Sequence, residues 1–291
     1  MPYRLLRSLM LMLPRVPPRI LPPLVWLAGG AAWYASRSLR ETTTDHMRRV
    51  LGPGAPRSTI ESRARDCVRT AAWYWVDLAR APRMTPEQTF ASLDSVEGLG
   101  ALFEAYDEGR GVVLLSAHLG NPEVFAAFLP LLGLPTAIFV EPLADRRAHA
   151  LIQSKRERGG ARMLYPDTAG LRAALAQLRC GGVLGGLADR DVLGSGRPYT
   201  FFGERAAMPD GLMEMALRAG APVVVGWVTR TKPGRYAAVV ERIALPEATG
   251  DRRRDLEAAQ YAYIRALERA IGRTPGQWAA LASVWQGLQW G

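Results

Sequence analysis

Apolar and polar residues alternate in blocks along the chain from about residue 98 onwards. Residues 111–117 form a short apolar run rich in β-branched side chains, which predicts a buried strand, and the helical spacing of residues 122–132 predicts a helix after it. The same alternation predicts further strands at 135–140, 161–165, 182–188 and 222–229, and helices at about 141–158, 167–179 and 208–219. Strands that alternate with helices through short connections indicate an α/β fold, with helices on both faces of a mostly parallel sheet.

The segments on either side complete this prediction. Residues 41–82 have helical spacing, with Thr59 as a plausible N-cap, and residues 236–241 predict an edge strand. Helices at 253–272 and 276–289 are expected to close the chain. The sequence has no internal repeat or long linker, so we expect one domain, residues 41–291, preceded by a distinct N-terminal segment, residues 1–40.

The first 40 residues mix arginines with leucines, methionines and aromatic residues, and they contain no acidic residue. This mixture is typical of helices that lie at a membrane interface. The longest uncharged stretch of this segment, residues 20–36, has 17 residues and carries Pro22 and Pro23 near its start. Only residues 24–36 are therefore expected to form regular helix, which is too short to cross a bilayer. We therefore expect membrane-docking helices on the cytoplasmic leaflet, with a single spanning helix as the alternative.

Charge adds a second indication. Lys plus Arg number 37 and Asp plus Glu number 27, so the net charge is +10. Such a balance favours an anionic partner. Only Lys155 and Lys232 are lysines, so 35 of the 37 cations are arginines, and a GC-rich genome explains this bias equally well. The interleaved apolar residues favour an anionic membrane surface over nucleic acid. Two cysteines exclude a disulfide-rich scaffold, and a total of three histidines argues against a histidine-rich metal centre.

Two predicted strands end in ionisable residues, where open α/β sheets bind their ligands. His118 follows the first strand, and Asp189 follows the fourth. Asn121 and Pro122 suit the start of the next helix and place Glu123 in its first turn. A carboxylate that fixes the imidazole tautomer would make His118 a general base, whereas the simpler interpretation is an ordinary surface histidine.

No protein nucleophile is evident beside His118. Ser116 lies two residues before it, but no G-x-S-x-G motif surrounds this serine, and the glycines fit neither a P-loop nor G-x-G-x-x-G. If His118 is a base, the hydroxyl group that it activates belongs to the substrate.

Several segments together resemble a known family. They are the H-x4-E element at 118–123, ADRD at 188–191, FFGERAAMPDG at 201–211 and PGQW at 275–278. In this order they resemble the bacterial lipid A biosynthesis (lauroyl/myristoyl) acyltransferases, a group that includes phosphatidylinositol mannoside acyltransferases. The resemblance implies transfer of a fatty acyl chain from a thioester to a hydroxyl group of a membrane glycolipid.

The resemblance also assigns residues. His118 matches the catalytic base, and Glu123 and Asp189 match two acidic positions, either of which is a candidate to orient the imidazole. Candidate substrate-binding residues are Arg156, Arg190, Phe201 and Phe202, of which the two phenylalanines either line an acyl-chain groove or anchor a turn at Gly203. The family often has Asn where this chain has His46, which we interpret as structural.

The family implies a protein at the inner (plasma) membrane, on its cytoplasmic face, that needs no metal or bound cofactor. The acyl donor is expected to be a thioester of acyl carrier protein or of coenzyme A, and the acceptor a membrane lipid; no nucleic-acid partner is expected. Three alternatives remain open: a lysophospholipid acceptor, a non-catalytic lipid-binding protein, and a metal-dependent hydrolase that uses His118, Glu123, Asp189 and Asp191.

Overall fold

A seven-stranded sheet forms the centre of the computed structural model, which describes residues 3–285. The strand order is β1-β9-β8-β2-β5-β3-β4, and the five strands from β8 to β4 are parallel to one another. β9 pairs antiparallel with β8, and β1 pairs parallel with β9. The bounds are β1 Leu93–Glu97, β2 Val112–Ser116, β3 Thr136–Phe139, β4 Arg162–Leu164, β5 Val183–Leu187, β8 Val223–Lys232 and β9 Arg235–Arg242. The predicted α/β fold is confirmed.

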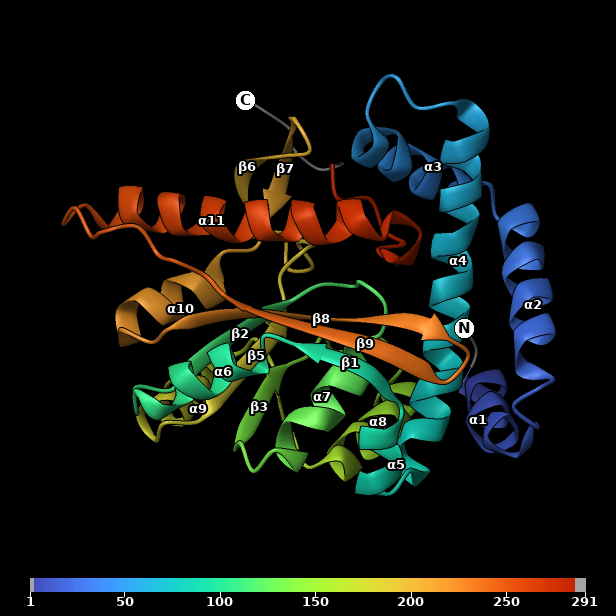
Figure 1. Ribbon diagram of the computed structural model, residues 1–291, viewed down its shortest axis with the longest axis horizontal. Helices are drawn as coiled ribbons and strands as arrows, with labels where there is room; N and C mark the ends of the chain where they lie inside the picture. Colours follow the sequence, from blue (N-terminus) through green and yellow to red (C-terminus); the bar gives the residue numbers. More distant parts are fainter. Residues whose placement is uncertain (1–2, 286–291) are drawn as a thin grey trace.

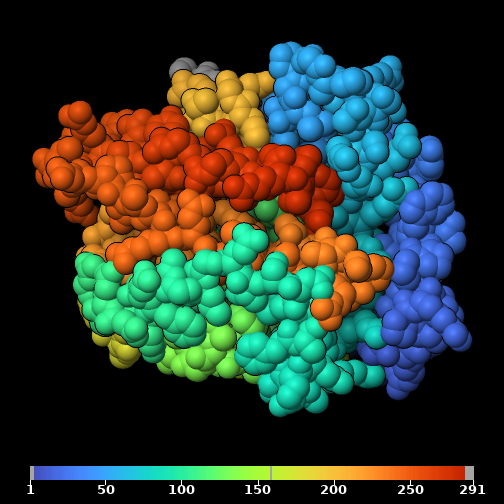
Figure 2. All heavy atoms as spheres, viewed as in Figure 1, coloured from blue at the N-terminus to red at the C-terminus, as the bar shows by residue number. Residues whose placement is uncertain are grey.

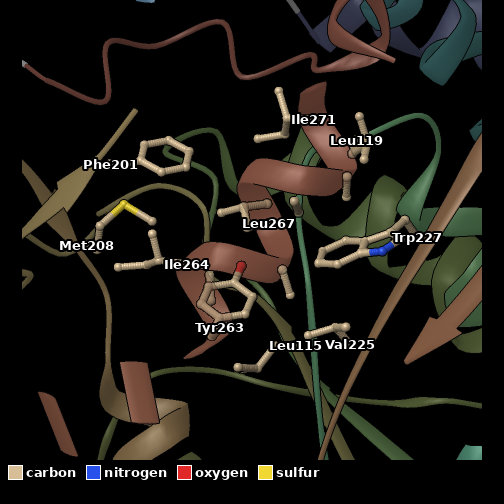
Figure 3. Close-up of a cluster of buried hydrophobic side chains, with 14 of the residues drawn as sticks. Leu115, Leu119, Phe201, Met208, Val225, Trp227, Tyr263, Ile264, Leu267 and Ile271 are labelled. Carbon is tan, nitrogen blue, oxygen red and sulfur yellow. The ribbon is translucent and has the colours of Figure 1, made fainter. Parts of the chain in front are cut away.

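Helices cover both faces of this sheet (Figure 1). One face carries α6 (Leu99–Asp107) and α7 (Pro122–Leu131), and the other carries α9 (Thr168–Arg179), α10 (Gly211–Ala219) and α11 (Arg252–Arg273). Side chains of the central strand β2 alternate between the two layers because successive residues of a strand point to opposite faces. Val112 and Leu114 join the core with α6 and α7, whereas Val113 and Leu115 join the core with α9 to α11. Figure 3 shows Leu115 and Val225 below Tyr263 of α11 in this second core.

The N-terminal helices pack along one side of this body, where they appear in blue in Figure 2. They are α1 (Tyr3–Met12), the 3-10 turn η1 (Leu13–Arg15), α2 (Leu21–Ala35), α3 (Arg37–Leu51) and α4 (Arg57–Arg80). Leu6, Met10 and Val25 of α1 and α2 are buried in one cluster with Val76 of α4. Within residues 3–285, no helix is both long enough and apolar enough to cross a bilayer.

Two local predictions in this region were wrong. Helix α2 begins at Leu21 rather than after the proline pair, because prolines in the first turn of a helix lose no hydrogen bond. The predicted single helix over 41–82 is two helices, since Gly52 ends α3 with a φ of 80° and Pro56 precedes α4. Thr59 therefore lies inside α4 and is not its N-cap.

Further differences lie toward the C-terminus. β9 is not an edge strand, because β1 pairs with its outer side. A separate hairpin of β6 (Arg197–Phe201) and β7 (Glu204–Met208) precedes α10, which delays the start of that helix. In place of the helix expected at 276–289, a 3-10 turn, η4 (Pro275–Gln277), leads into an irregular segment up to residue 285, and the rest of that prediction lies outside the described residues. Short elements complete the fold: η2 Ala81–Arg83, α5 Pro86–Ala91, α8 Arg146–Arg156 and η3 Glu157–Gly159.

Candidate active site

The carboxyl ends of β2 and β5 bring His118 and Asp189 together. These two strands are parallel neighbours in which Ser116 pairs with Leu187, and the amide of Ala188 donates to the carbonyl of Ser116 at 2.9 Å. The chain leaves both strands at the same edge of the sheet, so the side chains that follow face each other. This is the position at which parallel sheets bind ligands.

The imidazole of His118 is held by the carboxylate of Asp189. Its Nδ1 lies 2.9 Å from Oδ1 of Asp189, and the backbone amide of His118 donates to Oδ2 at 3.0 Å. The His118 side chain is 29% exposed, whereas that of Asp189 is fully buried. Burial opposes ionisation of Asp189, but the charge of His118 and the hydrogen bonds from His118 and Trp278 outweigh it, so the pKa of this carboxyl lies below its usual range.

This geometry gives His118 the chemistry of a general base. An ionised Asp189 accepts a proton-bearing Nδ1, which leaves the lone pair of the neutral ring on Nε2. With Nδ1 bound to Asp189 and the side chain partly exposed, Nε2 is the nitrogen that can take a proton from a bound hydroxyl group.

Gly120 allows the loop after β2 to pass against β8. Its φ is 65°, and a Cβ atom at this position would lie 2.0 Å from the carbonyl oxygen of Val228. Only glycine fits such an approach in a left-handed conformation. The next amide, that of Asn121, donates to the same Val228 carbonyl at 2.7 Å, which fixes the loop that carries His118.

The start of α7 follows the sequence prediction. Asn121 is the N-cap, and its side chain accepts from the amide of Glu123 at 3.0 Å, with Pro122 in the first turn. The amide group of Asn121 also donates to Asp77 of α4, whose carboxylate forms an ion pair with Arg230 of β8. Burial raises the pKa of Asp77. This buried network ties the His118 loop to α4 and β8.

Glu123 faces away from His118. Its carboxylate accepts from Arg156 Nε at 2.9 Å and from the hydroxyl of Tyr74 at 2.7 Å. The side chains of Glu123 and Arg156 are only 12% and 20% exposed. Burial and the neighbouring Glu123 raise the pKa of Tyr74, so its hydroxyl stays protonated and donates. Of the two carboxylates predicted as candidates to orient His118, Asp189 occupies that position.

Trp278 contacts Asp189 directly, a contact that the sequence analysis did not identify. Its indole Nε1 donates to Oδ2 of Asp189 at 2.8 Å, and the side chain is 1% exposed. The only sequence signal for it is the PGQW segment, which ends in this tryptophan. His46, expected to be structural, is buried and stacks on the Trp278 ring with centroids 5.0 Å apart.

The other candidate residues lie around this centre. Arg190 forms an ion pair with Glu141 at 3.0 Å. Phe201 is fully buried in the core, and Phe202 has a φ of 46° beside Gly203 in the β6–β7 turn, so these residues form a core-anchored turn and Phe201 has no surface on a groove. Ser116 is buried and donates to the carbonyl of Gly226, which removes it as a nucleophile.

The four side chains of the alternative metal site do not converge. Asp191 accepts backbone amides of the loop that follows it, including those of Gly194 and Gly196 at 2.9 Å. Glu123 is bound by Arg156. Among the residues that the structure describes, no group of three or more His, Cys, Asp or Glu side chains is arranged to hold a metal ion.

Two cavities lie near the N-terminal helices, and neither is lined by His118. A cavity of about 170 Å³ lies between α4, α7 and α8; it has a mainly apolar lining, with Glu123 and Arg156 at its wall. A larger one of about 780 Å³ lies between α3 and α4. Carboxylates already pair with most of the arginines that line it, as in Arg49–Asp45 and Arg57–Glu61.

The sequence is similar to one family of known proteins over nearly its whole length. Residues 6–286 match the family described as bacterial lipid A biosynthesis acyltransferase. A phosphatidylinositol mannoside acyltransferase of Mycolicibacterium smegmatis is 29% identical over 237 residues, which cover 77% of this chain and 77% of that protein. A protein of the same name from Mycobacterium tuberculosis (strain CDC 1551 / Oshkosh) is 26% identical over 236 residues, covering 77% of this chain and 74% of the relative.

Proposed function

Since this chain belongs to the bacterial lipid A biosynthesis acyltransferase family and is an acyltransferase, we propose that it moves a fatty acyl chain from a thioester to a hydroxyl group of a membrane glycolipid. The observation that carries the proposed mechanism is the contact between His118 Nδ1 and the buried Asp189 carboxylate. This contact leaves Nε2 as the base, at the carboxyl ends of β2 and β5.

The reaction proceeds in two steps on the substrate's own atoms. The acceptor hydroxyl oxygen attacks the thioester carbonyl carbon while its proton moves to Nε2 of His118. The tetrahedral intermediate then collapses, the carbon–sulfur bond breaks, and the imidazolium returns the proton to the leaving thiolate. The products are an ester and a free thiol. Positioned proton transfer of this kind contributes about 10²–10⁴-fold to the rate. Backbone amides or Arg190 are the candidates to stabilise the oxyanion.

The acyl donor is a thioester of either acyl carrier protein or coenzyme A. Both donors are anionic, and the net charge of +10 favours their approach to this protein. No metal or bound cofactor has a part in the proposed steps.

The N-terminal helices supply the proposed membrane contact on the cytoplasmic face of the inner membrane. One face of α1 and α2 is buried against the protein, while the other exposes large apolar side chains, including Met12 (60%), Trp26 (58%) and Leu27 (61%). Arg4, Arg7, Arg15 and Arg19 lie on the same segment. Apolar side chains among arginines favour an anionic leaflet.

The test is a transfer assay with purified protein and labelled acyl donors. Acyl-carrier-protein and coenzyme A thioesters are each offered with vesicles that contain a mannosylated phosphatidylinositol, lipid A precursors or a lysophospholipid. We expect a new ester on a glycolipid and no product with His118→Ala. An ester found only on the lysophospholipid would contradict the glycolipid acceptor, and release of free fatty acid alone would contradict acyl transfer.

A further inference from the structure

We propose that Trp278 is a positioning residue for the His118–Asp189 pair, and that its indole N–H holds the Asp189 carboxylate in the orientation the base requires. This inference rests on the proposed function, because the reaction assigned to His118 gives the orientation its purpose. Trp278 lies 89 residues beyond Asp189 in the sequence, in the irregular segment after η4.

Within the described part of the chain, three hydrogen bonds reach the Asp189 carboxylate, and Trp278 supplies one of them. His118 occupies Oδ1 through Nδ1 and shares Oδ2 through its backbone amide. The indole donates to Oδ2 at 2.8 Å. Since an indole N–H is a donor only and does not titrate, it stabilises the ionised carboxylate throughout the working pH range.

The backbone around Trp278 is bonded directly to the loop that carries His118. The amide of Gly120 donates to the carbonyl of Gln277 at 2.8 Å, and the amide of Ala279 donates to the carbonyl of His118 at 2.7 Å. Leu119 and Trp278 thus form an isolated antiparallel bridge. The catalytic loop and the tryptophan are therefore held in one fixed register.

Aromatic side chains fix the indole ring itself. His46 stacks on it at 5.0 Å with an angle of 26° between the planes, and Phe201 meets it edge to face at 5.8 Å. Burial lowers the pKa of His46 to about 4, so its ring is neutral at the pH of the cell. The buried Phe201 supports the ring that holds Asp189.

Few other titratable groups face Asp189. His118 lies on one side, and His46 and the hydroxyl of Tyr263 are the further neighbours whose charges it influences. Tyr263 donates to the carbonyl of Ser116 at 3.2 Å, and burial raises its pKa far above the physiological range. His46 and Tyr263 both remain neutral near pH 7. Loss of the Trp278 indole donor would therefore change the proton affinity of the His118–Asp189 pair.

The matched variants are Trp278→Phe and Trp285→Phe. Both keep an aromatic ring in the same cluster, but Trp285 donates to the carbonyl of Phe201 at 3.3 Å and not to Asp189. We expect Trp278→Phe to lower kcat by roughly 10-fold with little change in KM, because a hydrogen bond to a charged group is lost. The indole N–H dipole stabilises the negative charge of Asp189, so its loss raises the affinity of the His118–Asp189 pair for a proton. The acidic limb of the pH profile of kcat/KM therefore moves to higher pH.

Trp285→Phe is expected to leave kcat and the acidic limb unchanged. The proposal is overturned if Trp278→Phe keeps full kcat, if its kcat falls while the acidic limb stays in place, or if both variants lose kcat equally.

A second measurement needs no activity and no substitution of Trp278. In the NMR spectrum of the full chain, one of the eight tryptophan indole N–H signals should shift in folded Asp189→Asn. An indole spectrum that this substitution leaves unchanged would overturn the positioning role. If no acyl transfer is found but this signal shifts as expected, the proposed function fails and the contact of Trp278 with Asp189 stands.

Discussion

The carboxylate of Glu123 is bound by the guanidinium of Arg156, and not by the imidazole of His118 five residues before it. The hydroxyl of Tyr74 completes this cluster, which joins α4, α7 and α8 behind the loop that carries His118. The H-x4-E element therefore divides its two residues between two tasks. His118 pairs with Asp189 at the carboxyl ends of β2 and β5, and Glu123 fixes the start of α7 through Arg156 and Tyr74.

Glu123→Gln tests this division. The substitution removes the charge that pairs with a largely buried Arg156, so we expect the free energy of unfolding to fall by about 2 kcal/mol or more. Urea unfolding measures it, with Glu97→Gln at an exposed end of β1 as the control. Turnover per folded molecule should fall much less than in Asp189→Asn. A variant with unchanged stability and no turnover would show that Glu123 takes part in the reaction.

Gly120→Ala tests the close approach of the His118 loop to β8. A Cβ atom would lie 2.0 Å from the Val228 carbonyl oxygen, so the loop must move, and both stability and turnover should drop. Gly109→Ala is the matched control, because Gly109 also has a positive φ, of 72°, but has open space where its Cβ would lie. The control should lose about 1 kcal/mol of stability and keep its kcat. Equal effects on kcat would show that the approach to Val228 has no role in placing His118.

His46 makes the stability of the protein depend on pH. Its pKa is about 4 in the folded state, against an ordinary value of 6.5, because burial disfavours the charged ring. The unfolded chain therefore gains a proton first as the pH falls, and the folded state loses up to about 3 kcal/mol between pH 7 and pH 4 from this group. The difference in unfolding free energy between wild type and His46→Asn should shift in favour of the variant over that range. Two parallel pH curves would show that His46 is not buried in its neutral form.

The exposed apolar face of the N-terminal helices should govern membrane binding. Replacing Met12 and Leu27 with Ser removes two large exposed apolar side chains without touching the buried face. We expect binding to anionic vesicles to weaken by at least 10-fold in a flotation assay, because each side chain contributes on the order of 1 kcal/mol or more. Leu171→Ser is the control, since Leu171 is also exposed but belongs to α9, a helix that lies on the opposite side of the molecule from α1 and α2 (Figure 1). If both proteins lose binding equally, or neither does, this face is not the docking surface.

The fold was predictable where strands are buried on both faces. β2 and β5 are continuous apolar runs, so residues 111–117 and 182–188 located them within one or two positions. β1 was missed because it is a half-exposed strand with a polar sequence at the end of the sheet. The β6–β7 hairpin was missed because its turn places Phe202 at a positive φ, where asparagine or glycine is the usual signal.

The part of the site that could be predicted consists of the residues that directly follow the predicted strands. His118 and Asp189 follow parallel strands, whose carboxyl ends lie at the same end of a sheet, but the adjacency of β2 and β5 is a feature of the observed topology that the sequence did not predict. The choice between Glu123 and Asp189 depends on contacts that no local pattern carries, since Arg156 and Tyr74 lie 33 and 49 residues from Glu123. The contact between Trp278 and Asp189 could not be predicted either, because the two residues lie far apart in the sequence.

Asp189→Asn tests the central claim, that Asp189 orients His118 as the base, most directly. The substitution keeps the size of the side chain but removes the charge that accepts Nδ1–H, so the imidazole loses the tautomer that leaves Nε2 free. The measurement is kcat for acyl transfer at saturating donor and acceptor, with circular dichroism to establish that the variant is folded. We predict that kcat falls by about 10²–10⁴-fold while KM changes little. A folded Asp189→Asn protein with a kcat within about threefold of wild type would contradict the account.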